Sequence, residues 1–300
     1  MPQIHAFLAQ AQPEGILGLI DRLARTPLSQ VVIFVAVCSV IRFGIFPYLL
    51  KTPKHLRSGL YTGLKFLNEF LDAVIYAGVF VFLIIRPFLV QTFYIPSGSM
   101  VQTLQVKDYI IANKLIYRYT EPQTGDIVVF KPPKRALRPD QGETDFIKRL
   151  QGRPGDLVEV KDDVLYRNGQ KIDEKYKAFT RENPPFSGKF YDLSPEEMAL
   201  EPKIDFKLVK YKGNLIPVTI DKTSGAVNDR SAIDYQIPPT DWEAVRNLPA
   251  EKIPQGMYLF MGDNRNNSSD GRFWGLVPRN SIIGRSEFIW LPFNRWRMTR

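Results

Sequence analysis

The sequence predicts a mainly β protein, with an antiparallel β-sheet core, an inserted cap domain and two N-terminal transmembrane helices as an anchor. Two long apolar runs precede residue 91, and short strand-like runs broken by turn residues follow it. A stretch richer in charge and proline then interrupts the strand pattern. The chain thereby begins with an N-terminal segment (1–27), a first span (28–50), a loop (51–70) and a second span (71–90). A first core part (91–160), the cap (161–254) and a second core part (255–300) follow.

The stronger expected span is LDAVIYAGVFVFLIIRPFLV at 71–90. It has about the twenty residues that a bilayer requires and is apolar on every face. Asp72 stands near its start, and Arg86 near its end can extend to the interface. The run at 28–50 is weaker because Arg42 and Pro47 interrupt its second half.

The charge pattern orients the two spans. Lys51, Lys54, Arg57 and Lys65 lie between them, and basic loops stay in the cytoplasm, so everything after residue 91 is expected on the opposite side. In a bacterium that side is the periplasm or the outer face of the cytoplasmic membrane. The net charge of +9 then indicates contact with anionic lipid. Nucleic-acid binding is not expected, because neither an aromatic-basic RNA motif nor zinc-finger spacing occurs.

Beyond residue 91 the pattern favours antiparallel strands. Apolar runs at 109–112, 126–130, 157–160 and 206–209 have strand length and composition. The pairs Gly125-Asp126, Gly155-Asp156 and Asn168-Gly169 are typical of tight turns.

Two serines follow directly on the second span, in YIPSGSM at 94–100. Pro96 fixes one φ angle and Gly98 permits conformations that other residues resist, so a tight turn is expected. As a bare pattern this is an ordinary turn. Its position at a membrane exit, however, would hold Ser97 and Ser99 where a membrane-inserted substrate can reach them.

A nucleophilic serine needs a base, and the chain offers few. His5 lies near a terminus and His55 in the cytoplasmic loop, so a lysine is the remaining choice. In a strand over DFIKRL, Lys148 shares one face with two apolar residues, Phe146 and Leu150. Lowering its pKa from about 10.4 to about 8 would need roughly 3 kcal/mol, which burial can supply. The alternative is a surface lysine on an edge strand.

The C-terminal stretch GDNRNNSSDGRFWG, from Gly262 onward, indicates a polar loop. It does not fit a calcium-binding EF-hand, because Arg265 occupies a ligand position and no glutamate closes the loop. Asp270 and Arg272 are expected to pair as a structural brace. With only two histidines and the single Cys38, neither a metal site nor a cofactor site is expected.

Four groups of motifs, in order, resemble those of the bacterial type I signal peptidases, membrane-bound serine proteases of the periplasmic face that remove signal peptides from secreted preproteins. YIPSGSMVQTL resembles the nucleophile box, KDYIIANKLIY and GDIVVFKPP the next strands, DFIKRLQGRPGD the lysine box, and GDNRNNSSDGRFWGLVP the C-terminal box. The resemblance covers the second span to Asp156, and then Gly256 to about Gly284. It implies cleavage after Ala-x-Ala sites, signal peptides and the bilayer as partners, and the export translocon as a candidate partner.

The resemblance also assigns roles. It implies Ser99 as nucleophile, Lys148 as general base, and Ser97 with the Ser99 amide as the oxyanion hole. Ser268 would orient the lysine, and Asp270, Arg272 and Gly262 would support it. Substrate-binding positions implied by the family are Ile95, Met100, Leu104, Asp145, Phe146 and Ile147. The chain departs from the family pattern at Gln102, Asn266 and Gly271, and Gly271 is expected to loosen the loop of Ser268.

Two rival hypotheses stay open. Self-cleaving repressors also use a serine and a lysine on a β fold, but they need a DNA-binding helix-turn-helix in place of the spans. A membrane-anchored scaffold or chaperone would need no catalytic groups at all.

Overall fold

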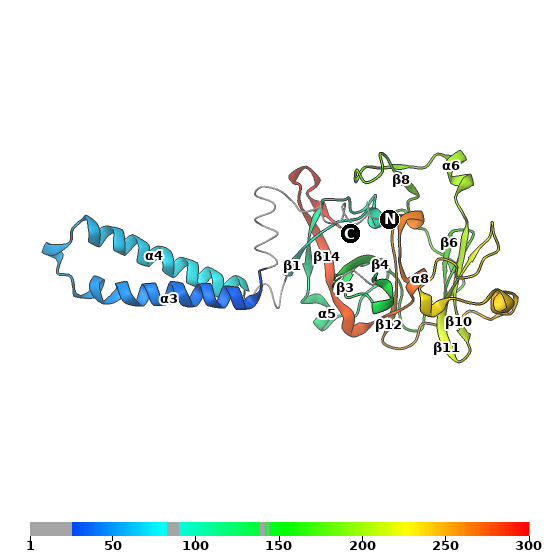
Figure 1. The fold of residues 1–300 in the computed structure, drawn as a ribbon, viewed down its shortest axis with the longest axis horizontal. Coiled ribbons are helices and arrows are strands. Elements are labelled where there is room, and N and C mark those ends of the chain that lie inside the picture. The colour runs from blue at the N-terminus through cyan, green and yellow to red at the C-terminus, as the bar shows by residue number, and fades with distance from the viewer. Residues whose placement is uncertain (1–25, 83–89, 139–141, 143, 300) are drawn as a thin grey trace. The chain divides into compact units, whose positions relative to one another are not determined.

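The computed structural model describes residues 26–82, 90–138, 142 and 144–299. These residues fall into two compact units, one up to residue 92 and one from residue 93 onward (Figure 1). The first is helical and the second is mainly antiparallel β, which confirms the expected class of the C-terminal part.

The first unit is a helical hairpin. Helices α3 (Leu28–Lys51) and α4 (Gly59–Val79) are joined by the short helix η1 (Lys54–Leu56). Arg42 Nη2 lies 2.7 Å from Asp72 Oδ1, and this ion pair links the two helices. Gly78 lets them approach closely, since a Cβ built on it would lie 3.1 Å from a methyl group of Val35.

The helices agree only in part with the two expected spans. Helix α3 matches the expected 28–50, and Ser29–Lys51 is, among the described residues, the one helix long and apolar enough to cross a membrane. Helix α4 begins at Gly59, so residues 59–70 are helical and do not form a loop. The expected span 71–90 begins within α4 and continues into 83–89, which lie outside the described residues, as does nearly all of 1–27.

The main sheet of the second unit is antiparallel, with strand order β1-β2-β14-β3-β4-β12-β13 and with β15 paired to β14. Its strands are β1 (Val90–Tyr94), β2 (Tyr109–Asn113), β3 (Ile127–Phe130), β4 (Phe146–Gly152), β12 (Met257–Met261), β13 (Val277–Pro278), β14 (Ile282–Leu291) and β15 (Arg297–Met298). Short helices η3 (Gly98–Met100), α5 (Ile116–Tyr119), η7 (Arg265–Asn267) and α8 (Gly271–Trp274) lie in its connections.

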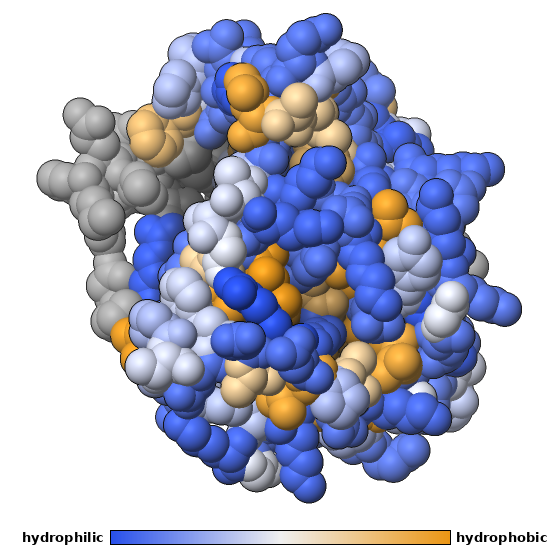
Figure 2. All heavy atoms as spheres, turned by 90° about the vertical axis from the view of Figure 1, so that its right-hand side faces the viewer, coloured by the Kyte–Doolittle hydropathy of each residue, from blue (hydrophilic) through white to orange (hydrophobic). Residues whose placement is uncertain are grey.

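A second sheet has the order β11-β10-β5-β6-β7, and a separate hairpin pairs β8 with β9. These strands are β5 (Val158–Lys161), β6 (Val164–Arg167), β7 (Gln170–Lys171), β8 (Thr180–Glu182), β9 (Phe190–Asp192), β10 (Ile204–Tyr211) and β11 (Asn214–Asp221). Helices α6 (Pro195–Leu200) and α7 (Trp242–Asn247) flank them. The face of the molecule seen in Figure 2 is mostly hydrophilic, with scattered apolar patches.

The two sheets share a core. Leu259 and Met261 of β12 in the main sheet pack with Val158, Leu208 and Ile253 in one buried apolar cluster. The expected cap boundary at 160/161 falls inside β5, which pairs with β10. The residues expected as a cap therefore pack directly against the main sheet.

The short apolar runs expected as strands lie in β2, β3, β5 and β10, which confirms those four predictions within a few residues. The expected turn glycines Gly125, Gly155 and Gly169 all have positive φ. Asn168 also has positive φ, so the loop between β6 and β7 has the backbone of a two-residue Asn-Gly hairpin turn.

The shared core yields a prediction about unfolding. Leu259→Ala should lower the free energy of unfolding of the whole β unit by about 2 to 5 kcal/mol, because it leaves a cavity between two sheets. Urea unfolding of the full chain in detergent measures this, with Leu200→Ala, which removes an exposed side chain of α6, as the control. A separate transition of residues 161–254, unaffected by Leu259→Ala, would contradict the shared core.

Candidate active site

The turn with the two serines leaves β1 and enters η3. Its start is fixed by Ile95, whose N–H donates to the carbonyl of Asp108 at 2.9 Å. Ser99 is buried and Ser97 is exposed, and their Oγ atoms lie 3.4 Å apart. One hydroxyl thus faces the interior and its neighbour faces the solvent.

Close packing, and not backbone conformation, requires a glycine at position 98. Its φ is not in the positive region, so the expected reason for this glycine is wrong. A Cβ at this position would lie 2.1 Å from Cζ of Phe190, a ring that reaches the turn from β9. Any side chain here would displace either the ring or the serines.

Lys148 lies in β4, which pairs with β3 on one side and β12 on the other. The alternative of a surface lysine on an edge strand is therefore wrong. The side chain is 6% exposed, and its Nζ lies 2.7 Å from Ser99 Oγ and 3.1 Å from the carbonyl oxygen of Ile147. Its apolar surroundings include the Phe146 ring, whose centroid is 5.6 Å from Nζ.

Burial lowers the pKa of Lys148 from its ordinary 10.5 to about 8, while the charges of Asp270 and Asp263 act in the opposite direction. No carboxylate forms an ion pair with this lysine among the described residues. Near neutral pH about one side chain in ten is then uncharged, against one in several thousand for an exposed lysine. The uncharged amine is the form that can accept a proton.

Each of the two carboxylates near Lys148 is paired with an arginine. Asp263 accepts from Arg149 Nε at 2.8 Å and from its Nη2 at 2.6 Å. Asp270 accepts from Arg272 Nε and Nη2, both at 2.9 Å, in the expected brace. Burial opposes the charge of Asp270, but Arg272 and backbone N–H groups hold its pKa below the ordinary value. These pairings balance the charge that would otherwise stabilise the lysine ammonium.

Ser268 lies close to Ser99 without forming a side-chain hydrogen bond to Ser99 or Lys148. The side chain is 5% exposed, and its Oγ has no hydrogen-bond partner among the described residues. A Cβ built on Gly262 would lie 2.2 Å from Ser268 Oγ and 2.6 Å from the carbonyl oxygen of Ser99. The glycine therefore lets the loop of Ser268 approach the serine turn.

An open cleft of about 370 Å³ is lined by both Ser99 and Lys148. Five of the residues expected to bind substrate line it, namely Ile95, Met100, Asp145, Phe146 and Ile147. The sixth, Leu104, does not: it is fully buried and packs behind Met100 in the core. Asn267 and Ser269 also line the cleft.

Comparison with known proteins identifies the family. A family model described as "Signal peptidase, peptidase S26" matches residues 67–291. The chain belongs to this signal peptidase family. It is 34% identical to a signal peptidase I of Buchnera aphidicola over 72% of each chain, and 35% identical to one of Aquifex aeolicus over 69% of this chain and 78% of that one.

A crystal structure of a signal peptidase I from Enterococcus faecalis aligns with 55% of this chain and 97% of its own, at 25% identity and a TM-score of 0.29. Because the chain belongs to a peptidase family, it is a peptidase. The two rival hypotheses, a self-cleaving repressor and a non-catalytic scaffold, do not agree with this family.

The departures of this signal peptidase from the family pattern have structural reasons. Gln102 has a φ of 81°, which a proline cannot adopt, and its Nε2 donates to Asp192 at 2.6 Å. Asn266 donates to the carbonyl and accepts from the N–H of Thr180, a pairing that needs an amide. Gly271 does not loosen its loop as expected: a Cβ there would lie 2.7 Å from the carbonyl oxygen of Phe260.

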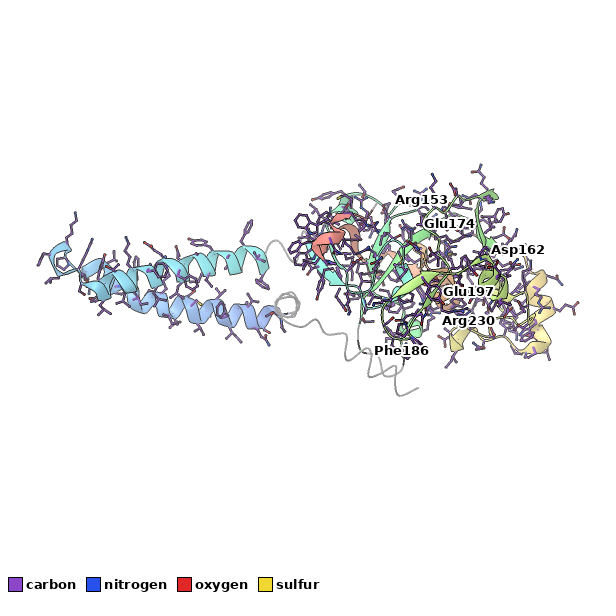
Figure 3. All side chains as sticks on the ribbon, turned by 90° about the horizontal axis from the view of Figure 1, so that it is seen from above. Arg153, Asp162, Glu174, Phe186, Glu197 and Arg230 are labelled. Atoms are coloured by element: carbon purple, nitrogen blue, oxygen red, sulfur yellow. The ribbon has the colours of Figure 1, made fainter. Side chains whose placement is uncertain are left out.

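Sequence reasoning missed the residues that join the serine turn, the loop after β12 and the segment before β8 at the candidate site. Asn264 donates from one Nδ2 to the carbonyl of Gly98 at 2.9 Å and to Thr180 Oγ1 at 2.7 Å, and its N–H donates to the carbonyl of Ser99. Arg265 pairs with Glu174, labelled in Figure 3, from the segment before β8. The polar run Gly-Asp-Asn-Arg directly after a strand was the available sequence signal for these residues. Their hydrogen-bond partners lie far away in the sequence and could not be identified from it.

The tight approach at Gly262 yields a prediction. Gly262→Ala should lower kcat/KM of this signal peptidase by about 100-fold, because the new methyl group forces Ser268 away from the backbone of Ser99. Peptide cleavage assays measure the effect. Gly142→Ala is the matched control, since a Cβ at residue 142 meets nothing within 4 Å. Wild-type activity in Gly262→Ala would contradict the steric argument.

Proposed function

We propose that this chain is a membrane-bound type I signal peptidase that cuts signal peptides from exported preproteins with a Ser99–Lys148 dyad. The observation that carries the proposal is the 2.7 Å contact between Ser99 Oγ and the Nζ of a buried lysine that no carboxylate neutralises directly among the described residues. Family membership supports the reaction class.

In the acylation step, the uncharged Nζ of Lys148 accepts the hydroxyl proton of Ser99 while Oγ attacks the scissile carbonyl carbon. The developing oxyanion accepts hydrogen bonds from the Ser97 hydroxyl and the Ser99 N–H. As the intermediate collapses, the C–N bond breaks and Lys148 gives its proton to the leaving amine. The mature protein leaves, and the signal peptide remains as an ester on Ser99.

In deacylation, Lys148 takes a proton from water, whose oxygen attacks the ester carbonyl. The second intermediate collapses, the signal peptide leaves with a new carboxyl group, and Ser99 regains its proton. Ser268 is proposed to orient the amine: its Oγ is buried near Ser99 without a partner among the described residues, so it can hydrogen-bond to Nζ as the lysine moves. Asp270 and Arg272 support its loop.

Small side chains are favoured by a cleft walled with Ile95, Met100 and Ile147. Strand β12 pairs with β4 only from Arg149 onward, so no described strand covers that edge of Phe146 and Ile147. An extended peptide can add to this edge, with alternate side chains entering the cleft. Alanine at the first and third positions before the cut fits this arrangement.

Membrane attachment is proposed through two spans, α3 and the run at 71–90. Support comes from the length and apolar character of Ser29–Lys51. Lys51, Lys54 and Arg57 lie at the turn between α3 and α4, which favours a cytoplasmic turn and a β unit on the periplasmic face.

The test is cleavage of a purified preprotein with an Ala-x-Ala site by the full chain in detergent. Wild type should cut after the second alanine, and Ser99→Ala and Lys148→Ala should each lower the rate by about a thousandfold or more, since each removes a group that takes part in every bond change. Ser281→Ala and Lys252→Ala are matched controls elsewhere in the unit, and Lys252 is exposed. Cleavage that survives either dyad change, or no cleavage by folded wild type, would contradict the proposal.

A further inference from the structure

A second, smaller pocket continues the catalytic cleft. It has a volume of about 180 Å³ and is lined by Arg230, Asn266, Asn267, Ser268, Ser269 and Phe273. Two of these residues, Asn267 and Ser269, also line the cleft beside the dyad. A chain that passes through the cleft can therefore continue into this pocket.

The direction of the substrate follows from the proposed function, on which this inference rests. Residues before the cut occupy the part of the cleft between 93–96 and 144–147. The scissile carbonyl lies at Ser99, so the residues after the cut leave past Asn267 and Ser269. Both side chains are exposed and can hydrogen-bond to an extended backbone. Arg230, labelled in Figure 3, stands in the pocket that follows.

Arg230 carries a charge that its surroundings do not balance directly. Its guanidinium lies 5.3 Å from the centroid of Phe273, and Arg272 lies 5.2 Å from the same ring. Arg272 is neutralised by Asp270, whereas Arg230 forms neither a hydrogen bond nor an ion pair with any described residue. The charge of Arg230 contributes to lowering the pKa of Asp221. However, Asp221 Oδ1 accepts hydrogen bonds from the backbone N–H groups of residues 223 and 224.

We propose that this pocket is a subsite for the first residues of the mature protein, in which Arg230 binds an acidic side chain downstream of the cut. A guanidinium presents paired N–H donors that match a carboxylate. Its contact with the Phe273 ring restricts its orientation before a substrate binds, which lowers the entropy lost on binding. The pocket has room for one carboxylate side chain. Arg230 is thus a specificity residue and has no part in the bond changes.

The experiment compares preproteins that differ only at one position after the cut. Glu and Gln are placed in turn at each of the first three positions, and kcat/KM is measured for the full chain in neutral detergent. Wild type should prefer Glu by up to about fivefold at one position, the effect of a solvent-exposed ion pair, since Arg230 is exposed. Arg230→Ala should abolish this preference, Arg230→Lys should retain part of it, and Arg230→Glu should reverse it in favour of Gln.

The readout is the ratio of two kcat/KM values for the same variant, which cancels any effect on folding or on the dyad. Lys210→Glu is the matched control, because Lys210 is an exposed cation on β10 that lines neither pocket, and it should keep the wild-type ratio. Added salt should weaken the preference.

Three results would overturn the subsite. If wild type cuts the Glu and Gln substrates equally at all three positions, the subsite fails while the proposed peptidase stands; if it cuts none of them, both fail. A loss in Arg230→Ala that is equal for Glu and Gln, and that appears only in vesicles containing phosphatidylglycerol, would assign Arg230 to an anionic lipid headgroup.

Discussion

The burial of Lys148 beside Ser99 is the constraint on which the rest of the site depends. Its pKa of about 8 lies below the ordinary 10.5, so the folded state releases its proton more easily than the unfolded chain. The difference corresponds to roughly 3 kcal/mol of stability that is missing below pH 8 and returns as the pH rises toward 10.5. The folded structure holds the amine against the serine despite this loss of stability, because Lys148 is fixed in β4, a central strand of the main sheet.

The surrounding ion pairs follow from that constraint. A free carboxylate near the amine would stabilise the ammonium and raise its pKa. Asp263 and Asp270 are each held by an arginine, and Asp270 also fixes backbone, because it accepts from Gly262 N–H at 2.9 Å. Asn264 and Phe190 then join the serine turn to the loops around it. Charge balance and loop position are thus provided by the same residues.

Much of this could be predicted from sequence because the signals are local. Alternation in DFIKRL placed Lys148 on an apolar face, and the positive-φ glycines marked the turns. The reason for Gly98, the place of Leu104 and the role of Asn264 were not predictable, since each depends on contacts with distant segments such as Phe190, Met100 and Thr180. The expected cap boundary at 160/161 fell inside β5, because the two sheets share one core and no linker in the sequence separates them.

The pH dependence of kcat/KM on a preprotein substrate tests the central claim most directly. Only uncharged Lys148 can accept the proton of Ser99, so kcat/KM should rise with pH and level off with an apparent pKa near 8. The plateau should appear well before an ordinary lysine would titrate. A profile that is flat through this range, or that turns only near 10.5, the ordinary lysine value, would contradict a buried lysine as the general base.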